Sequence, residues 1–332
     1  MRHTFFCIDG HTAGNPVRLV VGGAPPLVGN TMSEKRRDFL ARFDWIRLGL
    51  MLEPRGHDLM SGGFLYPPTS GEADVAFLFI ETSGCLPMCG HGTIGIATFG
   101  LEHGLIVPRA PGRFVADTPA GSISLTYDME DGRVRSVRLT NVASYVVADD
   151  IRIDVPTLGP LKVDVAYGGN FYAIVEPQGA YRGLDSFGAA RILEISPVVR
   201  RLVHEKLQPV HPLDPSIRGV SHVMWTDQPK AKGADGRNAV FYGERAIDRS
   251  PCGTGTSARL AHLHARGQLK VGDSFVHESY IGSRFIGRIE AETRVGSYSA
   301  ITPSIEGSAF ATGFSQIWID DQEPFARGFQ VA

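Results

Sequence analysis

The sequence predicts an α+β protein built from two similar halves, and three observations lead to this prediction. The chain has 332 residues, enough for one large domain or two ordinary ones. The pattern C-G-x-G-T occurs at Cys89–Thr93 and again at Cys252–Thr256, about half the chain apart. Strand-like segments outnumber helical ones and do not alternate with them regularly, which argues against a doubly wound parallel sheet.

The elements of the first half follow in chain order. The N-terminal residues, Met1–Gly10, are typical of a strand that runs into a turn. A helix is expected over 32–43, where Ser33 could serve as the N-cap. A strand over Asp74–Ile80 leads to the first cysteine motif, and the apolar run after that motif predicts a helix that ends at Gly104.

The second half repeats this order. A strand over Asn238–Tyr242 precedes the second cysteine motif, and a helix that ends at Gly267 follows it. A longer helix is expected over 186–206 with an interruption at Ser196–Pro197, because serine is a natural N-cap and proline a natural first helical residue. The polar turn Tyr127–Gly132 marks the expected boundary between the halves. The remaining expected strands lie at 113–117, 121–127, 133–139, 161–167, 171–176, 219–225, 274–279 and 284–291.

Composition narrows the class of protein. The 33 Lys and Arg residues nearly balance 35 Asp and Glu residues, and no basic stripe is visible, so neither nucleic acid nor an anionic membrane is expected as a partner. No stretch approaches the roughly 18 apolar residues of a membrane span, and the first residues do not resemble a signal peptide. We therefore expect a cytoplasmic protein. Four cysteines are too few for a disulfide scaffold, which leaves free thiols available for chemistry.

A cysteine directly before a helix has a defined chemical environment. The first turn of a helix carries N–H groups without intrahelical partners, and the helix dipole places partial positive charge there. Both effects stabilise a thiolate. The glycines after Cys89 and Cys252 remove side-chain bulk, so that a carboxylate can reach the bare amides.

Two such junctions that face each other would hold a small carboxylic acid with one thiol on each face of its α-carbon. One thiolate could remove the α-proton while the other thiol supplies a proton from the opposite side. The amides would stabilise the negative charge that develops. This is two-base racemisation or epimerisation, and it requires no cofactor. Which thiol serves which enantiomer is not given by the sequence.

Other interpretations of the cysteines stay open. Cys85, Cys89 and His91 form a C-x3-C-x-H pattern, which would make the chain a zinc-stabilised binding module. A disulfide between the two motif thiols would instead make it a redox sensor. Cys7 lies inside a strand and is expected to be an inert core residue.

Four longer segments of the chain share a further likeness: Met88–Gly95, Asp248–Ala258, His11–Arg18 and Asp321–Phe329. They resemble the signatures of the proline racemase family, and the resemblance covers essentially the whole chain. Within that family the likeness is greatest to bacterial members that interconvert trans-4-hydroxy-L-proline and cis-4-hydroxy-D-proline. Members that dehydrate 3-hydroxyproline usually keep only one of the two cysteines, so the presence of both points away from dehydration. A proline racemase remains the alternative.

The resemblance implies a diaminopimelate-epimerase-like fold. In this fold two pseudo-symmetric α/β halves each wrap a curved sheet around a central helix, and the active site lies in the cleft between them. It also implies that the C-terminal segment returns to the first half. The first half would then comprise 1–127 with about 314–332, and the second half 128–313. Assembly as a homodimer is left open.

The resemblance also implies roles for individual residues. Cys89 and Cys252 match the acid/base cysteines. Asp248 matches a residue near the imino nitrogen of the substrate, and His222 a position that lines the site. The positions expected to grip the carboxylate are Gly90, His91, Gly253 and Thr254.

The ring of the substrate is expected to lie against Ser61, Phe79 and Tyr242. Similar proline racemases line this pocket with aromatic residues. A serine where phenylalanine is usual leaves room, and a hydrogen-bonding group, for a ring hydroxyl. Proline would leave that group unpaired, so the pocket favours 4-hydroxyproline.

Overall fold

The computed structural model describes residues 1–331, which divide into two compact units. The first unit comprises Met1–Leu139 together with the residues from Glu306 onward, and the second comprises Thr140–Ile305. The turn expected to separate the halves lies inside the first unit. Asp131 and Gly132 both have positive φ, the conformation of a tight hairpin turn, and they connect β6 (Gly121–Glu130) to β7 (Arg133–Thr140).

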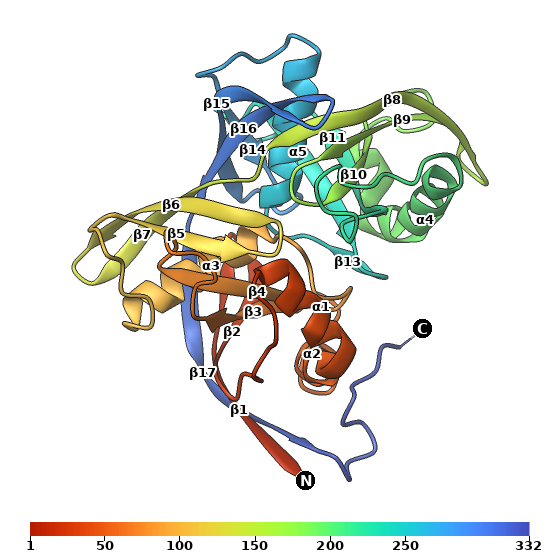
Figure 1. Cartoon of the computed structure of the whole chain (residues 1–332). Coiled ribbons are helices and arrows are strands. Elements are labelled where there is room, and N and C mark those ends of the chain that lie inside the picture. Colours follow the sequence, from red (N-terminus) through yellow and green to blue (C-terminus); the bar gives the residue numbers. More distant parts are fainter. Residues whose placement is uncertain (332) are drawn as a thin grey trace. The chain divides into compact units, whose positions relative to one another are not determined.

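The first unit is a mixed sheet in the order β17–β1–β2–β3–β4–β5–β6. Successive pairs are antiparallel, antiparallel, parallel, antiparallel, parallel and antiparallel. In Figure 1 the red β1 and the blue β17, from opposite ends of the chain, run side by side. The other elements are β1 (Arg2–Thr12), β2 (Asn15–Gly22), α1 (Met32–Arg42), α2 (Asp44–Met51), β3 (Ser61–Tyr66), β4 (Val75–Glu81), α3 (Gly90–Glu102), β5 (Arg113–Thr118) and β17 (Ala309–Asp320).

The second unit repeats this arrangement in the order β8–β9–β10–β11–β12–β14–β15, with the same sequence of antiparallel and parallel pairs. A short strand, β13, also pairs with β12, and β16 pairs with β8. The elements are β8 (Ser144–Val155), β9 (Gly159–Tyr167), β10 (Phe171–Val175), α4 (Leu184–Lys206), β11 (Val220–Asp227), β12 (Gly236–Tyr242), β13 (Ala246–Ile247), α5 (Gly253–Ala265), β14 (Ser274–Glu278), β15 (Arg284–Val295) and β16 (Tyr298–Gly307).

The cysteine helices occupy equivalent places in the two units. Along the chain, α3 connects the parallel strands β4 and β5, and α5 lies in the connection between the parallel strands β12 and β14. Parallel neighbours cannot be joined by a hairpin, so each of these helices is one of the crossover connections of its unit. Each motif cysteine immediately precedes the first residue of its crossover helix.

α3 is buried on every side, because all residues from Gly90 to Leu101 are buried. It packs against β1, β2, β3 and β17. Small residues make this possible. A Cβ added at Gly95 would lie 2.9 Å from the side chains of Thr12 and Val17, and one at Gly100 would lie 2.5 Å from Ile106. A helix that is apolar all round belongs in a core of this kind.

Most expected elements are present, but the helix starts predicted at Ser33 and at Ser196–Pro197 are not observed. α1 begins after Thr31, not Ser33, and Thr31 forms a capping box with Glu34. The long helix α4 is continuous through Pro197 and breaks instead at Gly188, where φ is 72°. Gly104 and Gly267 follow the ends of α3 and α5 with positive φ, as expected of C-terminal caps.

The continuity of α4 has a local cause in Ser196. Its hydroxyl donates to the carbonyl of Ile192 at 2.6 Å and accepts from the indole N–H of Trp225 at 2.8 Å. A serine with both bonds made inside a helix is not available to start a new one. Among residues 1–331, no helix is both long and apolar enough to cross a membrane.

Thr31→Ala tests the cap of α1. The Thr31 hydroxyl accepts from the Glu34 N–H at 3.2 Å, so alanine should lower the free energy of unfolding by about 1 kcal/mol in urea denaturation. Thr31→Ser keeps the hydroxyl and should stay within about 0.5 kcal/mol of the parent. Equal losses in both variants would show that the hydroxyl is not what stabilises the helix start.

Candidate active site

Cys89 is the N-cap of α3. Its backbone is extended (φ −140°, ψ 106°), and its Sγ accepts a hydrogen bond from the Gly92 N–H at 3.3 Å. The final threonine of the motif secures the turn, since both the N–H and the hydroxyl of Thr93 donate to the Cys89 carbonyl at 2.8 Å. The sulfur therefore occupies the position where a helix accepts negative charge.

The second glycine of each motif makes room for the sulfur. A Cβ added at Gly92 would lie 2.8 Å from the Cys89 Sγ. A Cβ added at Gly255 would lie 3.1 Å from the Cys252 Sγ and 2.8 Å from the Met224 methyl. These glycines let the sulfur approach a backbone N–H, a role additional to the one expected from the sequence.

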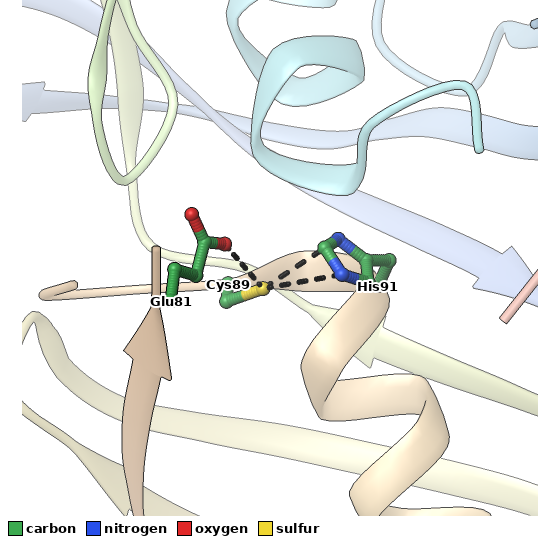
Figure 2. A group of neighbouring side chains, drawn as sticks. All are labelled: Glu81, Cys89 and His91. Atoms are coloured by element: carbon green, nitrogen blue, oxygen red, sulfur yellow. Dashed lines mark hydrogen bonds between the residues drawn. The ribbon is translucent and has the colours of Figure 1, made fainter. Parts of the chain in front are cut away.

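Cys89 lies between a carboxylate and an imidazole, as Figure 2 shows. The thiol donates to Glu81 Oε1 at 3.5 Å, and His91 Nδ1 lies 3.5 Å from Sγ. All three side chains are buried. Glu81 is the last residue of β4, so the strand before the motif delivers the carboxylate directly to the thiol.

The structure corrects the expected zinc set. Within residues 1–331, the cluster that gathers around Cys89 contains Glu81 and His91, and Cys85 does not belong to it. Cys85 packs instead in the hydrophobic core with Phe39 and Leu78. Burial raises the pKa of the Cys85 thiol to about 12, and that of Cys7, also in this core, to about 12. Both thiols are therefore protonated near neutral pH.

The far side of the His91 ring is held by two polar side chains. Ser61 Oγ lies 2.6 Å from His91 Nε2 and also donates to the Pro16 carbonyl at 2.8 Å. Asn15 Nδ2 lies 3.0 Å from the same ring nitrogen. Ser61 is fully buried, and its hydroxyl is occupied by protein groups. The Ser61 hydroxyl therefore contacts His91, and its expected place against the substrate ring stays a prediction.

Cys252 precedes α5 in a strained conformation. Its φ is 65°, a left-handed value that non-glycine residues rarely adopt. Asp248 organises the loop before it, because the carboxylate accepts from both the N–H and the hydroxyl of Ser250 at 2.8 Å. Ser250 Oγ in turn accepts from the Cys252 N–H at 3.1 Å. Asp248 is thus part of the support that presents the thiol.

Hydroxyl groups surround the Cys252 sulfur. The Tyr172 hydroxyl lies 3.2 Å from Sγ and 2.6 Å from Thr254 Oγ1. Burial first and the Asp248 carboxylate second raise the pKa of the Cys252 thiol, while hydrogen bonds from Tyr172 and the Gly255 N–H oppose that rise. Sequence reasoning missed Tyr172, which lies in β10 and is 80 positions from Cys252.

The remaining expected residues are grouped within each unit. Phe79 is buried on β4 near the first turn of α3, 3.6 Å from a Cβ built at Gly92. His222 on β11 packs its ring 4.7 Å from Tyr172, and Tyr242 on β12 stacks on His222 at 6.3 Å. Gly90 and Gly253 are the first residues of α3 and α5.

A separate cavity of about 620 Å³ in the second unit contains none of the expected site residues. It is lined by residues of β8, α5, β15 and β16, including Tyr145, His264 and Arg294. The chemistry that the sequence indicates is therefore concentrated at the helix N-termini and not in this hollow.

A thiol at the N-terminus of a buried crossover helix, repeated in two units of one topology, defines a two-thiol α+β protein. The chain belongs to the proline racemase family. The family model described as Proline racemase matches residues 7–330.

Known proteins similar to the chain match it along nearly their whole length. A 4-hydroxyproline 2-epimerase of Shewanella loihica is 60% identical over 331 residues, covering 100% of this chain and 99% of the relative. One of Brucella suis biovar 1 is 59% identical with the same coverage.

Solved structures also match the chain along nearly its whole length. A hydroxyproline epimerase from Agrobacterium vitis with bound trans-4-hydroxy-L-proline has a TM-score of 0.92 at 34% identity, covering 99% of this chain and 95% of that one. A PhzF-family protein of Bacillus anthracis, at 15% identity and a TM-score of 0.61, covers 96% of this chain and 99% of its own, and shows the fold alone.

Gly92→Ala tests the seat of the sulfur. Because a Cβ would lie 2.8 Å from Sγ, the sulfur must move and lose the Gly92 N–H bond, so alkylation of Cys89 by iodoacetamide near pH 8 should slow by about tenfold. Gly71→Ala is the matched control, since an added Cβ there meets nothing within 4 Å. An unchanged alkylation rate in Gly92→Ala would contradict this account of the motif.

Proposed function

We propose that the chain epimerises trans-4-hydroxy-L-proline to cis-4-hydroxy-D-proline at the α-carbon, without a cofactor, and that Cys89 and Cys252 act on opposite faces of that carbon. The observation that carries the proposal is the repeated thiol at the N-terminus of a buried crossover helix. The epimerase names of relatives about 60% identical over the whole chain support the choice of substrate. The proposal includes the diaminopimelate-epimerase-like arrangement, with the substrate between the two units.

The substrate carboxylate would bind to the N–H groups that begin α3 and α5. The N–H groups of the first helical turn point toward the positive end of the helix dipole, which attracts an anion. The residues concerned are Gly90, His91, Gly253 and Thr254, which open the two helices. Because the donors are fixed before the substrate arrives, they stabilise the charge of the deprotonated α-carbon without reorganisation.

The proton transfers then balance without any further reactant. One thiolate takes the α-proton and becomes a thiol, and the electron pair of the broken C–H bond is held by the α-carbon and its carboxylate. The opposite thiol delivers its proton to the other face and becomes a thiolate. The two sulfurs have exchanged protonation states, so the reverse reaction starts from the enzyme that the forward reaction leaves. Glu81 and His91 beside Cys89, and Tyr172 beside Cys252, are placed to influence these states.

The proposal of 4-hydroxyproline as the substrate is supported by the relatives more than by Ser61. The serine hydroxyl is bound to the Pro16 carbonyl and to His91, so its effect on a ring hydroxyl would be indirect, through the imidazole. Phe79, Tyr242 and His222 remain the proposed lining of the ring pocket, and Asp248 the residue near the imino nitrogen. A second candidate is proline racemase, favoured by a solved structure described as a probable proline racemase from Agrobacterium radiobacter, 37% identical with a TM-score of 0.91 over 98% of this chain and 96% of that one.

Turnover in deuterated water tests the reaction itself. Incubation with trans-4-hydroxy-L-proline should give cis-4-hydroxy-D-proline with deuterium at the α-carbon, detected by proton NMR, because the returning proton comes from an exchanged thiol. L-Proline should react at least about tenfold more slowly. Faster turnover of proline would favour the racemase, and product that keeps protium at the α-carbon would contradict two-base chemistry. Activity lost on chelation and restored by zinc would contradict a cofactor-free mechanism.

Single serine variants test the two thiols. Cys89→Ser and Cys252→Ser should each lower kcat by about 10²- to 10⁴-fold, because a hydroxyl is a far weaker acid than a thiol, while circular dichroism stays unchanged. Cys7→Ala changes a buried core thiol and should keep near-parental turnover in the folded protein. Near-parental turnover in either serine variant would remove that cysteine from the mechanism.

A further inference from the structure

We propose that Tyr172 is a positioning residue that donates a hydrogen bond to the Cys252 thiolate and adjusts its basicity. This inference rests on the proposed function for its role in turnover. Tyr172 lies in β10, which pairs with β9 and β11. Its side chain is fully buried, with a relative accessibility of 0%. Its ring belongs to the core cluster that contains Met224, Val240 and Cys252 itself.

The hydroxyl of Tyr172 is one link in a directed chain. Asn170 Nδ2 can only donate, and it donates to Thr254 Oγ1 at 3.4 Å. The Thr254 hydroxyl keeps its own proton, which it can donate to the Tyr172 oxygen 2.6 Å away. In that arrangement the Tyr172 O–H points at the Cys252 Sγ, 3.2 Å away. The chain ends in the sulfur and supplies it with a neutral donor.

Such a donor answers a specific electrostatic cost. The thiolate of Cys252 is buried and close to the Asp248 carboxylate, and both conditions disfavour negative charge on sulfur. Burial also raises the pKa of Tyr172 well above its ordinary value, so the phenol keeps its proton at any pH where the enzyme would work. Tyr172 is therefore a constant donor and not a competing base.

The same hydroxyl suits the other state of the sulfur. When Cys252 is a thiol, Tyr172 can turn its O–H toward Thr254 Oγ1, and its oxygen can accept the S–H. One side chain thus satisfies both protonation states through which the proposed reaction passes. The ring of His222, 4.7 Å from that of Tyr172, limits the movement of the phenol.

The surroundings of Cys89 are of a different kind. Its Sγ faces the carboxylate of Glu81 and the ring of His91, and these groups belong to the first unit. A change at Tyr172 should therefore affect one sulfur and leave the other as an internal reference within the same molecule.

Tyr172→Phe tests the proposal by removing only the hydroxyl. The apparent pKa of Cys252, measured as the pH dependence of its alkylation by iodoacetamide with peptide mass spectrometry, should rise by about one unit, while that of Cys89 stays unchanged. The pH–rate profile for epimerisation should shift in the same direction, and kcat should fall by about tenfold. Alkylation requires no turnover, so this readout stands even if the proposed function fails.

Two further variants sharpen the result. Tyr181→Phe is the matched control, because Tyr181 is equally buried in the second unit and its hydroxyl donates to the Thr226 carbonyl; the pKa of Cys252 should not move. If Tyr172→Phe does not fold, Thr254→Val takes its place. It keeps the shape of the side chain but removes the hydroxyl that lies 2.6 Å from the Tyr172 oxygen and 3.9 Å from the Cys252 Sγ, so it should raise the pKa of Cys252. A folded Tyr172→Phe with unchanged Cys252 alkylation and an unchanged pH–rate profile would overturn the proposal.

Discussion

A sulfur atom set against the backbone amides of the first turn of a buried helix is the interaction on which both units depend. The helix must be buried to keep its first turn dry, yet burial removes the water that would otherwise satisfy those amides. Small residues along α3 allow strands to close around it, and the parallel strand pair on either side of each helix fixes where its first turn lies. The glycines at 92 and 255 then leave the space in which the sulfur can lie against an N–H.

The two units share a topology but surround their thiols with different chemistry. Cys89 has titratable neighbours, Glu81 and His91, and the imidazole is fixed from behind by Asn15 and Ser61. Cys252 has neutral hydroxyl neighbours and a strained backbone. The proposed reaction treats the two faces of one carbon alike, yet the side chains around the two thiols differ. The shared topology places the two sulfurs at equivalent positions, and the unlike neighbours in each unit influence how each sulfur holds its proton.

The sequence is a good guide to features that are local. The two cysteine motifs, the strands before them and the glycines after their helices lie within a few residues of one another, so the chain itself displays them. Features that depend on chain pairing are hidden. Tyr172 reaches Cys252 only because β10 lies in the same sheet as the strands around α5, and nothing near either residue signals it. Ser61 and Asn15 meet His91 for the same reason. Ser33 and Ser196 are of a residue type that often caps helices, but neither does so here. Thr31 caps α1, and the Ser196 hydroxyl bonds to the Ile192 carbonyl within α4.

The pairing of β1 with β17 bears on how the protein is made. The register runs from Arg2 opposite Asp320 to Thr12 opposite Ala309. One edge of β1 pairs with the neighbouring β2, but its other edge is covered only after the whole second unit and β17 have been synthesised. The second unit is contiguous, from Thr140 to Ile305, and can complete its own sheet earlier. Synthesis therefore favours an order in which the unit encoded later folds first. Until β17 has been synthesised, β1 carries an open edge that can pair with other chains.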